Sequence, residues 1–248
     1  MANGPLSQYP IMSRTFLTAE WRDLILANYA VEPSLLEPHL PKGLELDLFK
    51  GQAVCSLVGF RFLRTRVMGV RWPGYVNFPE INLRFYVREK RADRRGVVFI
   101  RELVRSRTVA GIARRLYNEP YVKAKISEQV SENETERGVG YRFSYNGGDG
   151  GMHVTSDAEA YLPAAESTEH WFKEHQWGYG QTRRGTTLRY EVRHPVWGCH
   201  RVRTSKITVD WGRIYGKKWA HMRHAEPLGV VLASGSEIEV RTAEQLSN

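Results

Sequence analysis

Polar and apolar side chains alternate along one segment of the chain, Phe78-Pro-Glu-Ile-Asn-Leu-Arg-Phe-Tyr-Val87. Successive side chains of a β-strand point to opposite faces, so the alternation predicts a strand with one packing face and one polar face. The polar face carries a carboxylate, an amide, a guanidinium and a phenol, which belong to Glu80, Asn82, Arg84 and Tyr86. A guanidinium can hold a carboxylate ligand through two hydrogen bonds, and a carboxylate can transfer protons. We therefore predict that Glu80 is catalytic and that the other three bind a ligand; an internal Glu80–Arg84 ion pair is the structural alternative.

A second carboxylate interrupts the next apolar run, which extends from Val97 to Val104. Strand alternation places Glu102 on an otherwise apolar face, together with Val98, Ile100 and Val104. A carboxylate with such neighbours must pair with a cation or bind a ligand. We predict that Glu102 is a second residue for acid/base catalysis. The alternative is a structural ion pair with one of three arginines, Arg105, Arg107 or Arg114.

The segment from Thr108 to Asn118 predicts an amphipathic helix. Its apolar residues fall at helical spacing, Ser106 or Thr108 is available to cap its start, and Asn118 and Pro120 are stop signals. Three side chains on this helix or at its exit are predicted to contact the ligand: Arg114, Glu119 and Tyr121. The structural alternative is a helix end closed by aromatic packing.

The rest of the chain predicts a mainly β protein of the α+β class, with helices at 33–39 and 167–175. Strands are expected at 24–31, 44–48, 53–62, 81–87, 97–104, 122–130, 139–145, 152–158, 186–194, 200–211 and 227–240. Segments 44–48 and 53–62 should form a hairpin, and the glycines of residues 146–151 a turn. We expect one curved or closed antiparallel sheet with a few packed helices. Residues 1–20 are expected to be a flexible arm and residues 21–248 a single domain.

The length and the cysteine content of the chain favour a cytoplasmic protein. A chain of 248 residues can bury a large core without disulfides, and a secreted protein of this size would usually have more cysteines than Cys55 and Cys199. The N-terminal sequence lacks a basic start followed by an apolar run, and no apolar stretch is long enough to span a membrane. We therefore expect no membrane partner.

No sequence signature indicates a metal or a cofactor. His221 and His224 stand three residues apart, but no Asp or Glu completes a zinc spacing. The chain also lacks the glycine-rich phosphate loops of nucleotide-binding proteins. We expect no cofactor.

The chain is basic, with a net charge of +9 and a pI near 9.6. Long-range attraction to anions follows, but charge alone does not identify the anion. Much of the excess positive charge lies in the short connection between the predicted strands 81–87 and 97–104, at Arg88, Lys90, Arg91, Arg94 and Arg95. A solvated hairpin tip is the favoured interpretation, and a nucleic-acid contact is the alternative. A homo-oligomer is compatible with the sequence, which does not define the oligomeric state.

Short segments along nearly the whole chain match a known family in order and spacing. They are Trp21-Arg-Asp-Leu-Ile, Leu40-Pro-Lys-Gly-Leu-Glu-Leu-Asp47, Phe78-Pro-Glu-Ile-Asn, Arg94-Arg-Gly-Val-Val-Phe, Ala113-Arg-Arg-Leu-Tyr-Asn-Glu-Pro-Tyr, His194-Pro-Val-Trp and Ser234-Gly. In these segments the chain resembles the YqjF-like family of uncharacterised conserved proteins, which belongs to the acetoacetate decarboxylase-like superfamily. The resemblance implies that superfamily's β-barrel fold, and it implies no known reaction.

The resemblance also has a bearing on catalysis. In the acetoacetate decarboxylases, a lysine directly after a helix-ending proline attacks the substrate ketone, and a neighbouring lysine lowers its pKa. Here Tyr121 and Val122 follow Pro120, so this pair is absent. Lys123 and Lys125 come next, and in an extended segment they would share a face with Tyr121. A Schiff-base decarboxylase or aldolase that uses Lys123 is therefore an alternative hypothesis.

The leading hypothesis combines the residues with the resemblance. Glu80 matches the superfamily's cavity carboxylate by its position on the strand before the hairpin and helix. We predict an acetoacetate decarboxylase-like protein that binds a small carboxylate- or carbonyl-bearing metabolite in an internal cavity. If it is an enzyme, we expect a lyase-type reaction on keto acids, with acid/base chemistry by Glu80 or Glu102.

Overall fold

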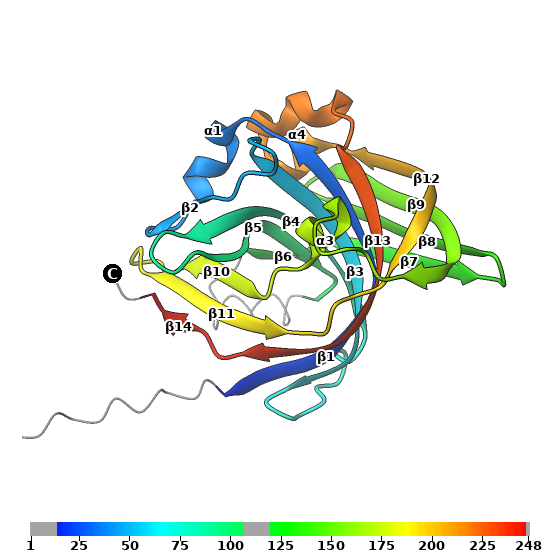
Figure 1. Cartoon of the computed structure of the whole chain (residues 1–248), viewed down its shortest axis with the longest axis horizontal. Helices are drawn as coiled ribbons and strands as arrows, with labels where there is room; N and C mark the ends of the chain where they lie inside the picture. Colours follow the sequence, from blue (N-terminus) through cyan, green and yellow to red (C-terminus); the bar gives the residue numbers. More distant parts are fainter. Residues whose placement is uncertain (1–13, 107–119, 247–248) are drawn as a thin grey trace, which may run out of the picture.

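The computed structural model describes residues 14–106 and 120–246, which are mostly strands joined by a few short helices (Figure 1). The strands are β1 (Thr15–Ala30), β2 (Leu44–Leu46), β3 (Val54–Val67), β4 (Phe78–Glu89), β5 (Arg94–Val104), β6 (Tyr121–Lys123), β7 (Lys125–Glu132), β8 (Glu136–Tyr145), β9 (Gly148–Tyr161), β10 (Trp177–Gln181), β11 (Thr187–Arg193), β12 (Cys199–Val209), β13 (Gly229–Arg241) and β14 (Glu244–Gln245). The helices are α1 (Pro33–Leu36), α3 (Thr168–Lys173) and α4 (Trp211–Tyr215), with 3₁₀ helices η1 (Glu37–His39) and η2 (Lys217–His224). The predicted mainly β class is confirmed.

Seven strands close into a ring in the order β1, β3, β4, β5, β10, β11, β13 and back to β1 (Figure 1). Neighbours in the ring are antiparallel except β5 and β10, which are parallel. Closure pairs each of these strands on both sides along part of its length, which protects strand edges from other chains. The predicted closed sheet is confirmed, but it is mixed and not purely antiparallel.

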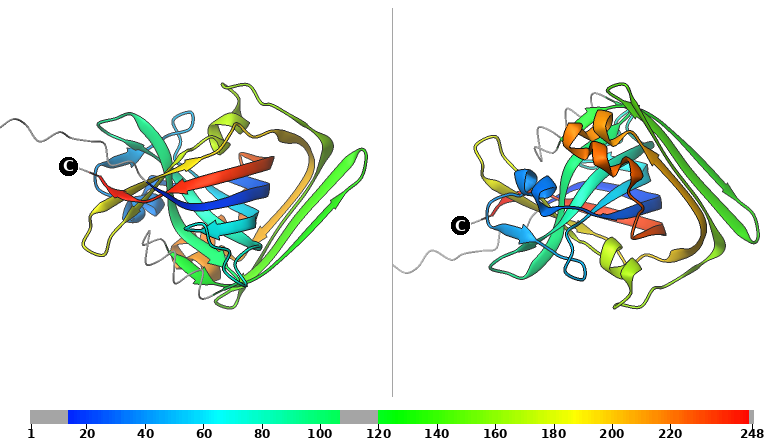
Figure 2. Two further views of the ribbon diagram at one scale, coloured as in Figure 1. Left: turned by 90° about the horizontal axis from the view of Figure 1, so that it is seen from below. Right: turned by 90° about the horizontal axis from the view of Figure 1, so that it is seen from above.

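Four further strands continue the sheet from β13 in the order β12, β9, β8 and β7. We call these four strands the flap. Figure 2 shows the flap bent back so that one of its faces looks at the outer surface of the ring. The helices α4 and η2 follow β12 in the chain, and their aromatic residues pack in the space between flap and ring.

The molecule therefore has two hydrophobic cores, and β4 contributes to both of them. Its odd-numbered residues pack in the core between ring and flap: Ile81, Leu83, Phe85 and Val87. Its even-numbered residue Tyr86 packs in the core inside the ring, against Phe172 of α3. The period of two in a strand thus separates the two faces of β4, as the sequence pattern predicts.

The turn between β8 and β9 is tighter than the sequence indicates. Tyr145 pairs with Gly148, so only Asn146 and Gly147 form the turn. Both have positive φ, at 52° and 74°, which a two-residue hairpin turn of type I′ requires and which Asn-Gly adopts readily. The glycines that follow belong to β9 and not to the turn.

Several elements differ from the sequence-based expectations. β1 begins at Thr15, so residues 15–20 of the expected arm are strand, held by pairing with both β3 and β13. β2 pairs with β4 and not with β3; the expected turn is present, closed by a bridge between Phe49 and Gln52, but no pairing of β2 with β3 extends it. β10 and α4 were not expected, since both are short and rich in glycine and aromatic residues.

The expected helices at 33–39 and 167–175 correspond to α1 with η1 and to α3. The helix predicted at 108–118 lies outside the described residues, as do Arg107, Arg114 and Glu119. Within the part of the chain that the structure describes, no helix has the length and apolar character needed to cross a membrane.

Candidate functional site

The polar face of β4 lines the inside of the ring. Glu80, Asn82 and Tyr86 expose only 2%, 3% and 1% of their surface, and Arg84 is partly buried. On the neighbouring strand β3, Phe60 pairs with Glu80 and Ser56 with Arg84, and both belong to the interior. These side chains therefore lie in the interior of the ring and not in bulk solvent.

Four buried polar side chains meet at one end of this face, on β4, β5 and β6; we call them the carboxylate cluster. They are Glu80, Asn82, Glu102 and Tyr121. Asn82 Nδ2 donates to Glu80 Oε1 at 3.1 Å, and the Tyr121 hydroxyl donates to Glu80 Oε2 at 3.2 Å. Glu102 of β5 pairs in register with Asn82 of β4 on one side and with Tyr121 of β6 on the other. Directly opposed side chains lie about 4.5–5.5 Å apart at Cβ, so the two carboxylates share one small region.

The neighbours predicted for Glu102 are partly wrong. Leu83 pairs with Arg101 and Arg84 with Phe99, so Ile100 is an extra residue in β5, a β-bulge. The bulge shifts the alternation by one residue, and Val98 and Ile100 consequently pack outside the ring while Glu102 faces inward. Simple alternation does not include bulges, and the sequence has no glycine here to signal one.

A second polar group, which we call the donor cluster, lies further along the same face beneath α3. Arg84 Nη2 and the Tyr86 hydroxyl both donate to the carbonyl of Phe172, at 3.0 Å and 3.3 Å. Ser56 hydrogen-bonds to Tyr86 and donates to Asn28 Oδ1 at 2.6 Å. Burial raises the pKa of Tyr86, so its phenol stays protonated and remains a donor. Sequence reasoning missed Ser56 and Asn28, which stand as single polar residues within otherwise apolar strands.

The helix α3 adds a histidine to the donor cluster. Ser167 caps the start of the helix by accepting from His170 N at 3.1 Å, and Phe172 near the helix end packs in the core inside the ring. His175 follows the helix, with its ring centroid 4.8 Å from that of Tyr86. Burial, with added repulsion from Arg84, lowers the pKa of His175 well below its ordinary value, which keeps the imidazole neutral. The expected helix placed His175 on one face with Trp171 and Phe172 but gave no indication that this face enters the ring.

An ion pair adjoins the same helix end. Lys173 is 1% exposed and pairs with Glu174, whose Oε1 also accepts from Trp197 N at 3.3 Å. His194 stacks on Trp197 with ring centroids 4.1 Å apart. Sequence reasoning missed Lys173, because lysine in a short helix is ordinarily exposed.

The lysines after Pro120 lie elsewhere. Lys123 and Lys125 are exposed, whereas Tyr121 is 9% exposed and contacts the carboxylate cluster. The shared face expected for these three is not formed, because the chain leaves β5 after β6 and pairs with β8 as β7. Among the predicted site residues, the structure brings together the four of the carboxylate cluster and, beside them, Arg84 and Tyr86.

The basic connection between β4 and β5 is largely neutralised. Arg88 pairs with Glu45 and Asp93, and Arg94 pairs with Glu89. Arg95 pairs with Asp47, and its guanidinium lies 4.7 Å from the ring centre of Trp171. Lys90 and Arg91 are exposed at the tip. A solvated hairpin explains these contacts of the β4–β5 connection better than a nucleic-acid surface does.

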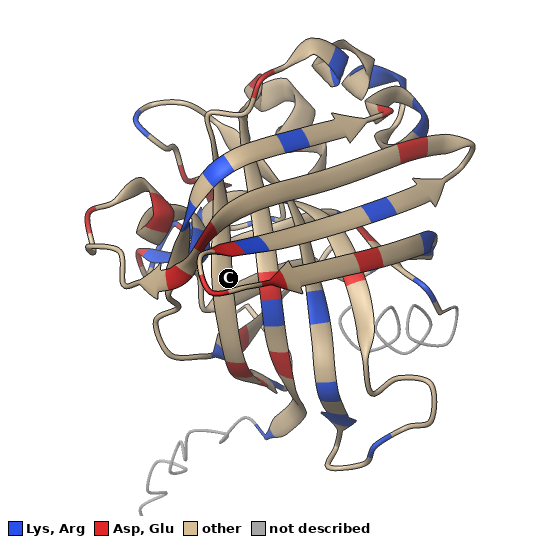
Figure 3. Ribbon diagram, turned by 90° about the vertical axis from the view of Figure 1, so that its right-hand side faces the viewer, with Lys and Arg blue, Asp and Glu red and all other residues tan. Residues whose placement is uncertain are grey.

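Figure 3 shows charges of both signs interspersed on the side that carries the flap.

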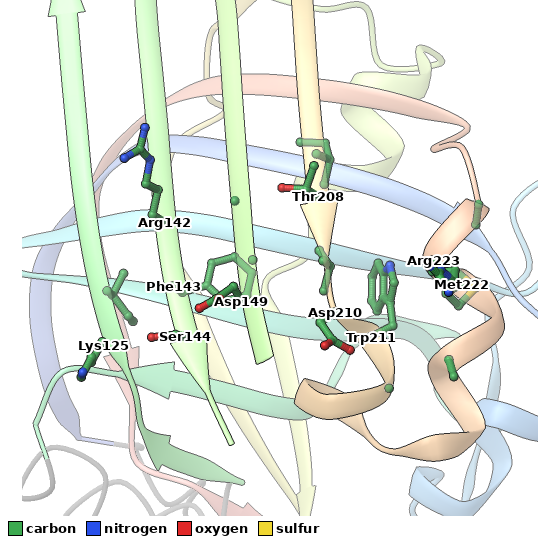
Figure 4. Close-up of a pocket in the computed structure, with 18 of the residues that line it drawn as sticks. Lys125, Arg142, Phe143, Ser144, Asp149, Thr208, Asp210, Trp211, Met222 and Arg223 are labelled. Atoms are coloured by element: carbon green, nitrogen blue, oxygen red, sulfur yellow. The ribbon is translucent and has the colours of Figure 1, made fainter. Parts of the chain in front are cut away.

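A groove of about 1020 Å³ opens between the flap and the helices α4 and η2 (Figure 4). Phe143, Trp211 and Met222 form its apolar floor. Its charged residues are of both signs: Lys125, Arg142 and Arg223 against Asp149 and Asp210. The groove lies on the flap side of the ring wall, and it is lined by none of the predicted site residues that the structure describes.

Within the described ranges, no group of three His, Cys, Asp or Glu side chains is arranged to hold a metal ion. Cys55 and Cys199 are both buried free thiols. Burial raises the pKa of Cys199 to about 12, so its thiolate is scarcely populated near neutrality.

Comparisons with known proteins identify a family for the chain and a relative within the curated proteins. Residues 18–237 match the family DUF2071, described as "Uncharacterized conserved protein". Over 135 residues the chain is 31% identical to the uncharacterized protein YqjF of Bacillus subtilis (strain 168). That match covers 50% of this chain and 54% of YqjF, so the chain spans about half the length of the curated relative it matches.

Solved structures with the same fold cover nearly the whole chain. Acetoacetate decarboxylase from Legionella pneumophila subsp. pneumophila str. Philadelphia 1 is 13% identical, with a TM-score of 0.66 over 99% of this chain and 92% of that one. An acetoacetate decarboxylase-like enzyme from Sphingomonas wittichii RW1 is 15% identical, with a TM-score of 0.67 over 94% of each chain. The enduracididine biosynthesis enzyme MppR, solved in complex with pyruvate, is 14% identical, with a TM-score of 0.62 over 99% of each chain. The chain therefore belongs to the DUF2071 family of uncharacterized conserved proteins, is similar to YqjF, and has the fold of the acetoacetate decarboxylases.

Proposed function

We propose that the protein binds a small metabolite with a carboxylate or carbonyl group inside the ring, at the carboxylate cluster. The observation that carries this proposal is the convergence of Glu80, Asn82, Glu102 and Tyr121 from three strands, all at most 9% exposed. Burying two carboxylates together is costly, and such groups are often kept for a function. MppR, which has the same fold, was solved with pyruvate bound, and this supports a ligand of that chemistry.

The cluster contains the groups that proton transfer next to a carbonyl requires. The Asn82 amide and the Tyr121 hydroxyl are donors that can polarise a carbonyl oxygen, and they now donate to Glu80. A ligand carbonyl that accepts one of these bonds would lie within reach of a carboxylate able to remove or return a proton. Any turnover would therefore be lyase-type acid/base chemistry on a keto acid by Glu80 or Glu102.

A binding panel tests this proposal. Wild type and Glu80→Gln are titrated calorimetrically with short keto acids and hydroxy acids, and Glu136→Gln, in the exposed start of β8, is the matched control. We expect Glu80→Gln to weaken binding of the hydroxy acids by about tenfold or more, because their hydroxyl can donate to this carboxylate and a hydrogen bond to a charged group contributes roughly 1.5–3 kcal/mol. Glu136→Gln should bind as wild type does. If wild type binds no member of the panel, or Glu80→Gln binds every member equally well, the proposal is wrong.

The Schiff-base alternative is decided separately. Wild type is incubated with acetoacetate and borohydride, and the modified residue is located by mass spectrometry, with Lys123→Arg as the control. The alternative requires an adduct on Lys123 that the control lacks. The exposure of Lys123 does not favour it, because lysine nucleophiles are activated by a desolvating pocket or an adjacent cation.

A further inference from the structure

The donor cluster beneath α3 has buried donors without acceptors. Arg84 Nε and both ring nitrogens of His175, one of which carries the proton of the neutral imidazole, lack a hydrogen-bond partner, and these atoms are buried. The carbonyl of Phe172, which adjoins them, already accepts from Arg84 Nη2 and Tyr86. Buried polar groups in native proteins nearly always have partners, so unpaired donors on two neighbouring side chains indicate a missing acceptor.

The charges around these donors favour an anion as the acceptor. Arg84 and Arg95 each add positive potential at His175. Their acidic neighbours are already engaged, since Asp47 pairs with Arg95 and Glu174 with Lys173. A carboxylate suits this place best, because it can accept from the guanidinium fork and from an imidazole N–H together.

Accessible surface is also available at this point. Arg84 on β4 and Phe99 opposite it on β5 are both only partly buried. The residues around them on the same inner face are almost wholly buried: Ser56, Val58, Asn82, Tyr86 and Val97. Arg84 and Phe99 thus keep some accessible surface among buried neighbours, and a ligand at Arg84 would find a charge on one side and an apolar ring on the other.

We infer that Arg84 and His175 form a carboxylate-binding subsite for the same ligand whose carbonyl lies at the carboxylate cluster. This inference rests on the proposed function and specifies the class of ligand. Each residue of a strand advances about 3.3 Å, so Arg84 lies roughly 7 Å along β4 from Asn82 and roughly 13 Å from Glu80. In addition, the Arg84 side chain leans away from Glu80, towards Phe172 and Tyr86.

This spacing excludes ligands in which carboxylate and carbonyl are adjacent. A carbon–carbon bond of about 1.5 Å advances an extended chain by only about 1.3 Å, so pyruvate cannot reach both clusters at once. The two groups need several methylene groups between them, and Phe99 supplies the apolar wall for that chain. The site is therefore built for a longer keto acid, with the carbonyl near one end and the carboxylate at the other.

A homologous series of methyl-ketone acids tests the spacing: pyruvate, acetoacetate, levulinate and the next two homologues. Calorimetric titration at constant pH should give dissociation constants that fall by about tenfold or more from pyruvate to the longest two, roughly the contribution of one charged hydrogen-bond pair. Arg84→Gln should remove this preference for length. His175→Phe, whose ring can stack on Tyr86 as the imidazole does, should weaken the long acids about fivefold and leave pyruvate unchanged.

A measurement on wild type keeps the test independent of folding in the variants. In protein labelled with ¹⁵N-histidine, the nitrogen signals of His175 should shift when the longest acid is added. They should not shift with a methyl ketone of the same length that has no carboxylate.

If the short acids bind as tightly as the long ones, or the plain ketone shifts His175 equally, the subsite is refuted while the proposed function stands. If no acid of the series or of the earlier panel binds, both proposals fail.

Discussion

Replacing Asp23 by asparagine should weaken the attachment of the flap to the ring. Asp23 lies in β1, is 1% exposed and has a φ of 58°. Its carboxylate accepts from Arg61 Nε of β3 at 2.7 Å and pairs with Arg137 of the flap strand β8. Its carbonyl accepts from the Tyr141 hydroxyl of the same flap strand at 2.9 Å. One residue thus connects two ring strands to the flap.

The size of the loss follows from the burial of the partners. Asparagine has the same shape and tolerates positive φ, so Asp23→Asn removes the charge without straining the backbone. Breaking a fully buried pair costs about 3–5 kcal/mol. The side chains of Arg61 and Arg137 keep 28% and 16% of their exposure, so water replaces part of the lost interaction. We therefore expect a loss of about 2–3 kcal/mol, which lowers Tm by about 5–10 °C in a protein of this size.

Thermal and urea unfolding, followed by circular dichroism, measure the effect. Asp157→Asn is the matched control, because Asp157 Oδ1 accepts from Arg203 Nε at 2.6 Å with both side chains more than a third exposed. A surface pair of this kind should contribute at most about 1 kcal/mol. Equal losses in the two variants would refute the assignment of Asp23 as the buried connection between ring and flap.

Three further predictions concern single residues. Gly235→Ala should lower the free energy of unfolding, measured by urea titration, by more than about 3 kcal/mol, because the φ of Gly235 is 74° and a Cβ would lie 2.0 Å from the Trp21 carbonyl oxygen. Gly51 is the control: its φ is 81° but it stands in open space, so Gly51→Ala should lower that free energy by only about 1 kcal/mol. Cys199 should resist iodoacetamide at pH 8 in the folded protein and react once urea unfolds it, since burial raises its pKa to about 12. Burial lowers the pKa of His175 below the ordinary 6.5, so the unfolded chain binds more protons below that pH and stability should fall as the pH drops from 6.5. The urea midpoint of His175→Phe should change less between pH 7.5 and 5.5 than that of wild type.

Local patterns predicted much of β4 and its surroundings. The alternation from Glu80 to Tyr86 identifies both the strand and its two faces, because one face is polar and the other wholly apolar. The same reasoning failed for Glu102, whose neighbours depend on one extra residue in β5. A bulge reverses every side chain beyond it, so an error of one residue changes the face of the rest of a strand.

The donor cluster could not be predicted in the same way. Ser56, Asn28 and His175 come from two ring strands and the end of a short helix, and their contacts depend on how α3 enters the ring. A sequence pattern describes one element at a time, whereas this cluster arises only when the ring closes and α3 packs inside it. Lys173 illustrates the point, since nothing in its local sequence distinguishes a buried lysine from an exposed one.

Tyr121 bears on both hypotheses about catalysis, the Schiff-base hypothesis and the acid/base hypothesis. It follows Pro120, where the acetoacetate decarboxylases are expected to carry their nucleophilic lysine, and its hydroxyl donates to Glu80 at 3.2 Å. A phenol at this position cannot form an iminium with a ketone, but it can donate a hydrogen bond to a carbonyl oxygen or to the enolate formed from it. The carboxylates beside it suit the removal of a proton better than the activation of an amine, because a nearby negative charge keeps an amine protonated. Under the function proposed above, we therefore expect acid/base chemistry at this site, and the inferred subsite at Arg84, further along β4, would set the length of the keto acid.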